Sequence, residues 1–149
     1  MKKRCEWVGN GSKKRVSEDP VYIDYHDNEW GKPLHDDQKL FEAIVLDGFQ
    51  AGLSWIIVLK KRENFRSAFD NFDPEKIAKY NENKIRELIN DKGIIRNKLK
   101  IKAAVTNAQA FLKVQREFGN FDKYIWAFVN HRTIINKWKS LKELPASTK

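Results

Sequence analysis

An eleven-residue stretch near the amino end, VYIDYHDNEWG, brings together tyrosines, a tryptophan, a histidine, acids and an amide. Asp24, Asp27 and Asn28 compete with the backbone for hydrogen bonds, which disfavours a helix or a strand over residues 21–31 and predicts a shaped surface. Aromatic rings there either fill the core, which is their commoner use, or stack on a planar ligand. The candidates outside any periodic apolar stripe are Trp7, Tyr22, Tyr25, Trp30 and Trp55. Their clustering beside acids and a histidine, where a plain core would use aliphatic side chains, favours a stacking site.

A carboxylate follows in LDGFQAGLSW (residues 46–55), where Asp47 stands at the end of a mostly apolar helix face. Gly48 and Gly52 beside it allow a backbone or a ligand to approach closely. Such a carboxylate is either a surface charge at a helix end or a desolvated hydrogen-bond acceptor in a pocket. Taken alone, the surface charge is the commoner of the two.

A basic turn follows in DKGIIRNKLKIKA (residues 91–103), where a glycine-bearing turn is expected to join two helices. The turn and the cations after it comprise Gly93, Arg96, Lys98, Lys100 and Lys102. Backbone N–H groups at a helix start, with lysines beside them, form an anion site suited to a DNA phosphate. A solvated helix face with its usual charges explains the same residues equally well.

The whole chain is basic, with 29 Lys and Arg against 20 Asp and Glu and a formal charge of +9. This excess favours polyanionic partners such as nucleic acid or an anionic membrane, although a general bias toward basic residues would produce it equally well. The length fits one domain, residues 1–149, and 41% apolar content suffices for a folded core. Cys5 is the single cysteine, which excludes an internal disulfide, and no apolar run is long enough to span a membrane or form a signal segment. We therefore expect a cytoplasmic protein that does not engage membranes.

Helical periodicity begins at Asp36 and continues through most of the chain, so we predict an all-α fold. In residues 36–49 the apolar side chains share one face, with Asp36 or Asp37 as the cap and Gly48 as an end or bend. Residues 50–69 contain the β-branched run LSWIIVL, but continuing helical spacing favours a buried helix over a strand. Further helices are predicted in 73–80, capped by Asp73, in 81–91, capped by Asn81 or Asn83, in a long stripe ending at Gly119, and in 121–131.

Several segments, in this order and spacing, resemble the DNA-3-methyladenine glycosylase I family of bacterial alkylation-repair enzymes. They are CEW, SEDPVYIDYHDNEWG, LFEAIVLDGFQAGLSWIIVLKKRENFRSAF, GIIRNKLKIKAAVTNAQAF and WAFVNH. The resemblance extends from Cys5 to Thr148, and YHDNEWG and QAGLSW are highly specific motifs. It implies a single all-α domain of the helix-hairpin-helix DNA glycosylase type.

The resemblance also implies an activity: flipping 3-methyladenine out of double-stranded alkylated DNA and hydrolysing its N-glycosidic bond, which leaves an abasic site. The methylated base is planar and cationic, so an aromatic pocket would hold it by stacking and cation–π attraction. Asp47 would accept hydrogen bonds from the amino edge of the base, serving recognition first and catalysis second. By similarity the pocket rings are Trp7, Tyr22, Tyr25 and Trp55, with Trp30 behind them. The turn from Gly93 to Lys98 would grip phosphates, assisted by Lys100 and Lys102.

Three features depart from the family pattern. Asp47 stands where the family has glutamate, and the shorter side chain would lengthen its hydrogen bonds unless the helix shifts inward. Residues 9–16, GNGSKKRV, resemble an insertion that adds a basic loop near the pocket. The family continues beyond the PAST segment with helices that complete a structural zinc site, of which Cys5 and His26 match two of the four ligands. We expect zinc to bind such a half site weakly, leaving a loosely held amino-terminal segment and lowered stability.

The leading hypothesis is a monomeric enzyme of base-excision repair. A non-catalytic alkylated-DNA-binding protein or an inactive, truncated remnant is the alternative, suggested by the shorter carboxylate and by the missing family helices. A basic helical domain that touches nucleic acid through charge alone is a third. Release of free 3-methyladenine from methylated DNA supports the enzyme, tight binding without release supports the binder, and specific retention of the base excludes the third.

Overall fold

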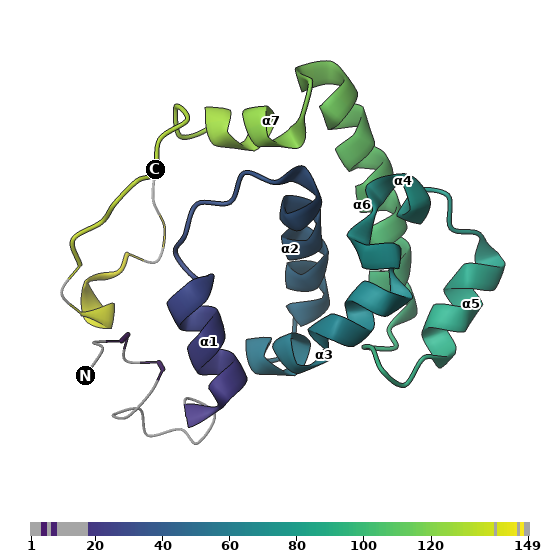
Figure 1. The fold of residues 1–149 in the computed structure, drawn as a ribbon, viewed down its shortest axis with the longest axis horizontal. Coiled ribbons are helices and arrows are strands. Elements are labelled where there is room, and N and C mark those ends of the chain that lie inside the picture. The colour runs from purple at the N-terminus through teal and green to yellow at the C-terminus, as the bar shows by residue number, and fades with distance from the viewer. Residues whose placement is uncertain (1–3, 6, 9–17, 139, 146, 148–149) are drawn as a thin grey trace.

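The protein is built from helices, and no strand occurs in the part described by the computed structural model, residues 4–5, 7–8, 18–138, 140–145 and 147 (Figure 1). In chain order the elements are α1 (Pro20–Asn28), α2 (Asp37–Gln50), α3 (Trp55–Ala68), the 3₁₀ turn η2 (Asp70–Phe72), α4 (Pro74–Ile77), α5 (Glu82–Asn90), α6 (Lys98–Phe118), α7 (Phe121–Ala127) and the 3₁₀ turn η3 (Leu141–Glu143). The predicted all-α class is confirmed. None of the described helices has the length and apolar character that crossing a bilayer requires.

The predicted start and stop signals are confirmed at several helix ends. The Asp36 side chain accepts a hydrogen bond from the Lys39 backbone N–H at 2.8 Å and caps α2. Asp73 and Asn81 accept equivalent bonds at the starts of α4 and α5. Gly119 ends α6 with a φ of 89°, a conformation that other residues rarely adopt.

The end predicted at Gly48 is wrong, because α2 continues through Gln50. Phe49, the residue after this glycine, is only 1% exposed, and burying its ring in the core stabilises the extra helical residues. The run LSWIIVL enters α3, which confirms a helix rather than a strand there.

The irregular surface predicted for VYIDYHDNEWG is also wrong, because most of this stretch forms α1. Asp19 caps the helix, accepting a hydrogen bond from a first-turn backbone N–H at 3.0 Å, and Pro20 occupies the first helical position. Asp24 accepts a hydrogen bond from the Asn28 side chain at 2.7 Å, and Asp27 binds an arginine. These side chains thus bond to one another and to other segments instead of competing with the helical backbone.

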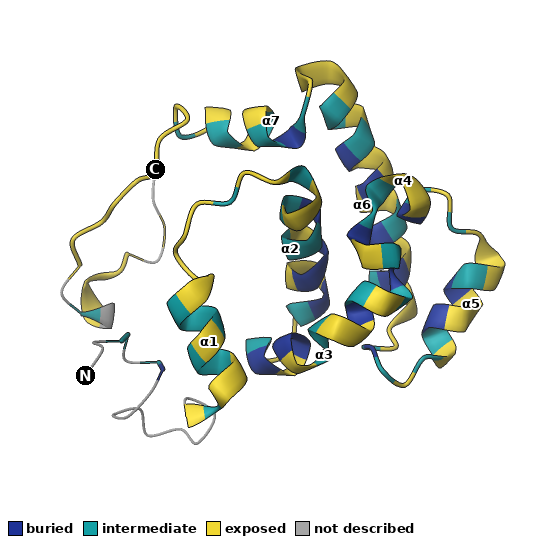
Figure 2. Cartoon of the chain, in the orientation of Figure 1, coloured by how far each residue is buried: buried dark blue, intermediate teal, exposed yellow. Residues whose placement is uncertain are grey.

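The core lies between α2, α3 and α6 and is rich in phenylalanine (Figure 2). α6 packs against α2, α4, α5 and α7, so one long helix organises most of the fold. Rings from distant segments meet in this core, including the Phe41–Phe111 pair at 5.0 Å and the Phe49–Phe65 pair at 4.7 Å between centroids. In contrast, α1 has no buried residue and packs on α3 at the edge of the assembly.

Asp37, the first residue of α2, joins the start of that helix to the start of α7. Its carboxylate accepts hydrogen bonds from the backbone N–H groups of Phe121 and Asp122, both at 2.8 Å, and from the Gln115 amide at 2.6 Å. Burial alone would raise the pKa of Asp37, but these three hydrogen bonds outweigh it and lower the pKa. One carboxylate thereby stabilises the N-terminal ends of two helices.

Candidate nucleobase-binding site

A cavity of about 510 Å³ opens between α1, α2 and α3, a size typical of small-molecule sites. Each helix contributes one of the residues expected to bind a base: Tyr25 from α1, Asp47 from α2 and Trp55 from α3. Their convergence confirms none of their roles, but it places two aromatic rings and a carboxylate in a single hollow. Apolar residues of α2, including Ala43 and Leu46, complete that part of the wall.

The ring pair in the cavity leaves polar groups available to a ligand. The Tyr25 and Trp55 rings meet edge to face, with centroids 5.6 Å apart. The indole Nε1 of Trp55 is buried without a hydrogen-bond partner among the described residues. The indole lies close enough to the Tyr25 hydroxyl to lower the pKa of that group slightly, against the larger effect of burial. The two groups are nevertheless not in hydrogen-bonding geometry. A buried N–H without a partner costs free energy, so this indole is the polar group of the pair with an unmet hydrogen bond.

Burial shifts the pKa of Asp47 and of Tyr25, two of the titratable groups that line the cavity. Asp47 is an exposed residue, yet partial desolvation within the cavity lining raises the pKa of its carboxyl group. Burial, followed by the charges of Asp47 and Glu29, raises the pKa of Tyr25, which keeps its hydroxyl protonated as a donor. The site therefore combines a partly desolvated acceptor with hydroxyl and indole donors.

Two of the predicted base-binding residues lie outside the lining of this cavity. The Trp7 ring meets the Tyr22 ring at 5.1 Å, the His26 ring at 5.1 Å and the Trp30 ring at 5.3 Å between centroids. These four side chains form a second aromatic cluster against α1, to which the helix itself contributes Tyr22 and His26, and Trp30 remains 48% exposed. Tyr22 is nevertheless near enough to Tyr25 for its charge to affect the pKa of that hydroxyl, so the cluster and the cavity adjoin.

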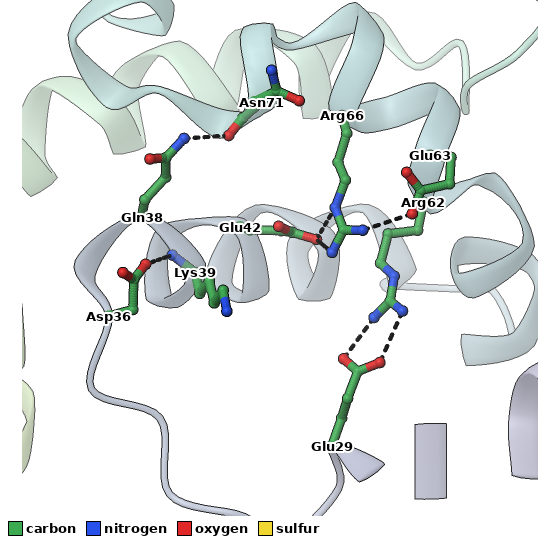
Figure 3. Close-up of polar contacts among 9 residues, drawn as sticks. All are labelled: Glu29, Asp36, Gln38, Lys39, Glu42, Arg62, Glu63, Arg66 and Asn71. Atoms are coloured by element: carbon green, nitrogen blue, oxygen red, sulfur yellow. Dashed lines mark hydrogen bonds and ion pairs between the residues drawn. The ribbon is translucent and has the colours of Figure 1, made fainter. Parts of the chain in front are cut away.

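A network of acids and arginines that borders the cavity escaped the sequence analysis (Figure 3). Arg62 of α3 binds Glu29, which follows α1, through two hydrogen bonds of 2.6 and 2.8 Å. Arg66, one turn further along α3, binds Glu42 of α2 at 2.7 Å and Glu63 at 2.6 Å. The spacing of the two arginines, four residues apart on one helix, was the available signal.

The two residues matched to a family zinc site lie side by side. The Cys5 backbone N–H donates to Nε2 of His26 at 3.4 Å, and Nδ1 of His26 lies 2.9 Å from Asp27. Asp27 also receives two hydrogen bonds from Arg4, at 3.0 and 2.8 Å, which fastens this part of the amino-terminal segment to α1. Among the described residues no three potential ligands gather, so they do not by themselves fit a four-ligand structural zinc site. The predicted insertion at 9–16 lies outside the described residues.

The basic turn lies between α5 and α6, and its residues divide into engaged and free groups. Gly93 fits where a Cβ would come within 3.0 Å of Asp91 and 3.2 Å of Asn64, so the chain approaches α3 closely. Lys100 donates to the carbonyls of Phe49 and Ala51 at the end of α2, and Lys102 pairs with Glu82 at 3.2 Å. Arg96 and Lys98 are exposed and make no hydrogen bond or ion pair with another described residue. Arg96 and Lys98 are therefore available to an external anion.

The comparisons with known proteins agree with one another. Residues 15–149 match the model of the methyladenine glycosylase family. The chain is 50% identical over 148 residues to a DNA-3-methyladenine glycosylase of Haemophilus influenzae, covering 99% of this chain and 76% of the relative. It is 49% identical over 145 residues to DNA-3-methyladenine glycosylase 1 of Escherichia coli, covering 97% of this chain and 73% of the relative.

Solved structures give the same result at the level of the fold. A crystal structure of 3-methyladenine DNA glycosylase I superposes with a TM-score of 0.87 at 47% identity, covering 98% of this chain and 76% of that one. A tyrosine-to-phenylalanine variant of a 3-methyladenine DNA glycosylase I, in complex with 3-methyladenine, superposes with a TM-score of 0.85 at 35% identity, covering 89% of this chain and 71% of that one. On the family match, the two relatives and the shared fold, this chain belongs to the methyladenine glycosylase family.

Proposed function

We propose that this protein is a DNA-3-methyladenine glycosylase, which releases 3-methyladenine from alkylated DNA by hydrolysing its N-glycosidic bond. The single observation that carries the proposal is the cavity in which Tyr25, Asp47 and Trp55 converge from three helices. Family membership supplies the reaction, and the cavity supplies a site whose chemistry suits the base.

The substrate explains the composition of the site. A 3-methyladenine nucleotide is cationic, so the electron-rich faces of Tyr25 and Trp55 and the carboxylate of Asp47 favour it over neutral adenine. Water adds to the sugar carbon as the glycosidic bond breaks, the bonding electron pair passes to the base and neutralises its charge, and one proton is released. The leaving base is thus already activated, and the protein contributes mainly capture, desolvation and positioning.

Within this reaction we assign Asp47 to the amino edge of the base. Its partial desolvation strengthens a hydrogen bond to an N–H donor, and its charge complements the cation. Trp55 Nε1 and the Tyr25 hydroxyl are donors for ring nitrogens. Trp7 and Tyr22, in the adjoining cluster, support the wall formed by α1.

We further propose that double-stranded DNA docks on the turn between α5 and α6, in the manner of a helix-hairpin-helix motif, and that the protein acts as a monomer. Arg96 and Lys98 are the exposed cations for phosphate contact. Lys100 instead holds the end of α2, beside Asp47, at a fixed place relative to this turn. Phosphate contact at the turn would thereby be coupled to the position of the base site.

Incubation of the protein with N-methylated duplex DNA and chromatography of the released bases tests the proposed function. Free 3-methyladenine, absent from a reaction with the protein heat-denatured beforehand, is the expected result. Tight and saturable binding of methylated DNA without release would instead support a non-catalytic binder. Equal binding of methylated and unmethylated DNA would support a domain that recognises charge alone.

A further inference from the structure

α1 supplies a wall of the base site but lies at the edge of the helical assembly. It has no buried residue, and it packs on α3 rather than into the phenylalanine-rich core. Bridges between side chains therefore supplement its half-buried contacts in fixing its position. Two ion pairs link it to α3: Asp19 with Lys60 at its beginning and Glu29 with Arg62 at its end.

The two ion pairs differ in burial, geometry and place. Lys60 is 53% exposed and meets Asp19 at 2.6 Å, away from the cavity lining. Arg62 is only 19% exposed, grips Glu29 through two parallel hydrogen bonds and lies in the cavity lining with it. Paired, fork-shaped hydrogen bonds fix distance and orientation together, which a single exposed lysine bridge does not.

The Glu29–Arg62 bridge is also connected to both rings of the base site. Glu29 ends α1, and its backbone N–H donates to the Tyr25 carbonyl at 2.9 Å. Arg62 lies seven residues after Trp55, two turns along the same face of α3. α1 and α3 are therefore joined at two places beside the cavity: by the Glu29–Arg62 bridge and by the edge-to-face contact of Tyr25 with Trp55.

We propose that Arg62 is a positioning residue for the base site, an inference that rests on the proposed function. Its bridge to Glu29 holds α1 against α3 at the spacing that admits a purine between the cavity walls. Arg62 acts through α1, not through contact with the base. Loss of either Glu29 or Arg62 removes the same attachment of α1 to α3, so the effects of the two substitutions should not add.

A direct effect of charge makes the opposite prediction. If the bridge acted only through its field, Glu29→Gln would leave an unpaired cation in the cavity and oppose a cationic substrate. Arg62→Met would leave an unpaired anion and favour the same substrate. Positioning requires both substitutions to act in the same direction, and it requires them to weaken binding of the released base, which is neutral.

The experiment compares wild type, Glu29→Gln, Arg62→Met, their double variant and, as the matched control, Lys60→Met. Affinity for free 3-methyladenine is measured calorimetrically, and single-turnover release is measured with a duplex that carries one 3-methyladenine. We expect both single variants to bind the free base roughly tenfold more weakly, the double variant to match them, and Lys60→Met to stay within about twofold of wild type. Arg62→Lys, which keeps the charge without the fork, guards against misfolding and should lose part of the affinity.

Unchanged affinity in both single variants, or changes of opposite direction in single-turnover release, would overturn the inference. Hydrogen–deuterium exchange of residues 20–28 gives a readout that does not depend on the reaction. Faster exchange in Arg62→Met than in Lys60→Met is expected, and equal exchange would overturn the inference. Failure of the wild type to release or bind 3-methyladenine would overturn the proposed function, while the exchange comparison would still decide whether Arg62 holds α1.

Discussion

The role of Asp47 gives the prediction with the clearest magnitude. Its charge is expected to raise kcat/KM, whereas the partial desolvation of that charge is expected to lower folding stability. Asp47→Asn removes the charge while keeping the size of the side chain and one acceptor oxygen. Unit charges about 4 Å apart attract by about 1 kcal/mol in water and about 4 kcal/mol at an effective dielectric constant near 20. Asp47 is exposed although its carboxylate is partly desolvated, so an intermediate value of about 2–3 kcal/mol applies. We expect kcat/KM for methylated DNA to fall roughly 30- to 150-fold.

Folding stability should change in the other direction. Because burial raises the pKa of Asp47 above its unfolded value of 3.8, the folded protein binds more protons than the unfolded chain between those two pKa values. Stability from this group therefore falls as pH rises through that window, and the cost persists at neutral pH. Asp47→Asn lacks this cost, so its Tm should exceed that of wild type at pH 7 and converge with it below pH 3.8.

The assay for Asp47 pairs single-turnover release from a methylated duplex with thermal unfolding at several pH values. Free 3-methyladenine is neutral and serves as the uncharged control ligand. Asp47→Asn should lower the affinity of the protein for this free base by a smaller factor than it lowers kcat/KM for methylated DNA. An Asp47→Asn variant with wild-type kcat/KM would refute the role in cation recognition. A lower Tm at pH 7 would refute the argument that the carboxylate is held at a desolvation cost.

Three further predictions concern other parts of the molecule. Replacing Arg96 and Lys98 by Ala should weaken binding to all DNA sequences alike and reduce the slope of log K against log salt by about 2, and an unchanged slope would remove both from the interface. Asp37→Asn, measured by urea unfolding, should destabilise the protein by about 1–3 kcal/mol because two backbone donors lose a charged acceptor. Because the pKa of Asp37 is lowered in the folded protein, this difference in stability should disappear as pH falls through that pKa. A difference that persists at low pH would contradict this origin. A chelator should leave the Tm unchanged, because Cys5 and His26 are only two ligands, and a clear drop would show that zinc is bound.

The helices were predictable where local signals and burial agree. Asp36, Asp73, Asn81 and Gly119 mark ends through hydrogen bonds or backbone conformations that depend on a few neighbouring residues. The end predicted at Gly48 is wrong because a glycine destabilises a helix by only about 1 kcal/mol, which is less than the free energy by which burial of a phenylalanine stabilises it.

The wrong prediction at α1 and the unforeseen contacts of the basic turn have a common physical origin, namely contacts between residues distant in the chain. Polar residues in α1 signal irregular structure only while their partners are unknown, and Arg4 lies 23 residues from the Asp27 that it binds. The engagement of Lys100 by carbonyls of α2 depends on packing across 49 residues or more, so the sequence could not separate it from the free Lys98. Residue type and pattern singled out Tyr25, Asp47 and Trp55, and family resemblance suggested their roles, whereas their convergence required the fold.

The central claim is that the cavity between α1, α2 and α3 receives the methylated purine, and the indole N–H of Trp55 reports on it most directly because it is buried there without a partner. A titration of ¹⁵N-labelled protein with 3-methyladenine, with the Trp55 signal assigned through Trp55→Phe, follows that group against the signal of Trp138, which lies outside the cavity lining. The account predicts a saturable shift of the Trp55 signal while the Trp138 signal stays in place. A Trp55 signal that does not move at saturating base, or a shift shared equally by both indoles, would contradict it.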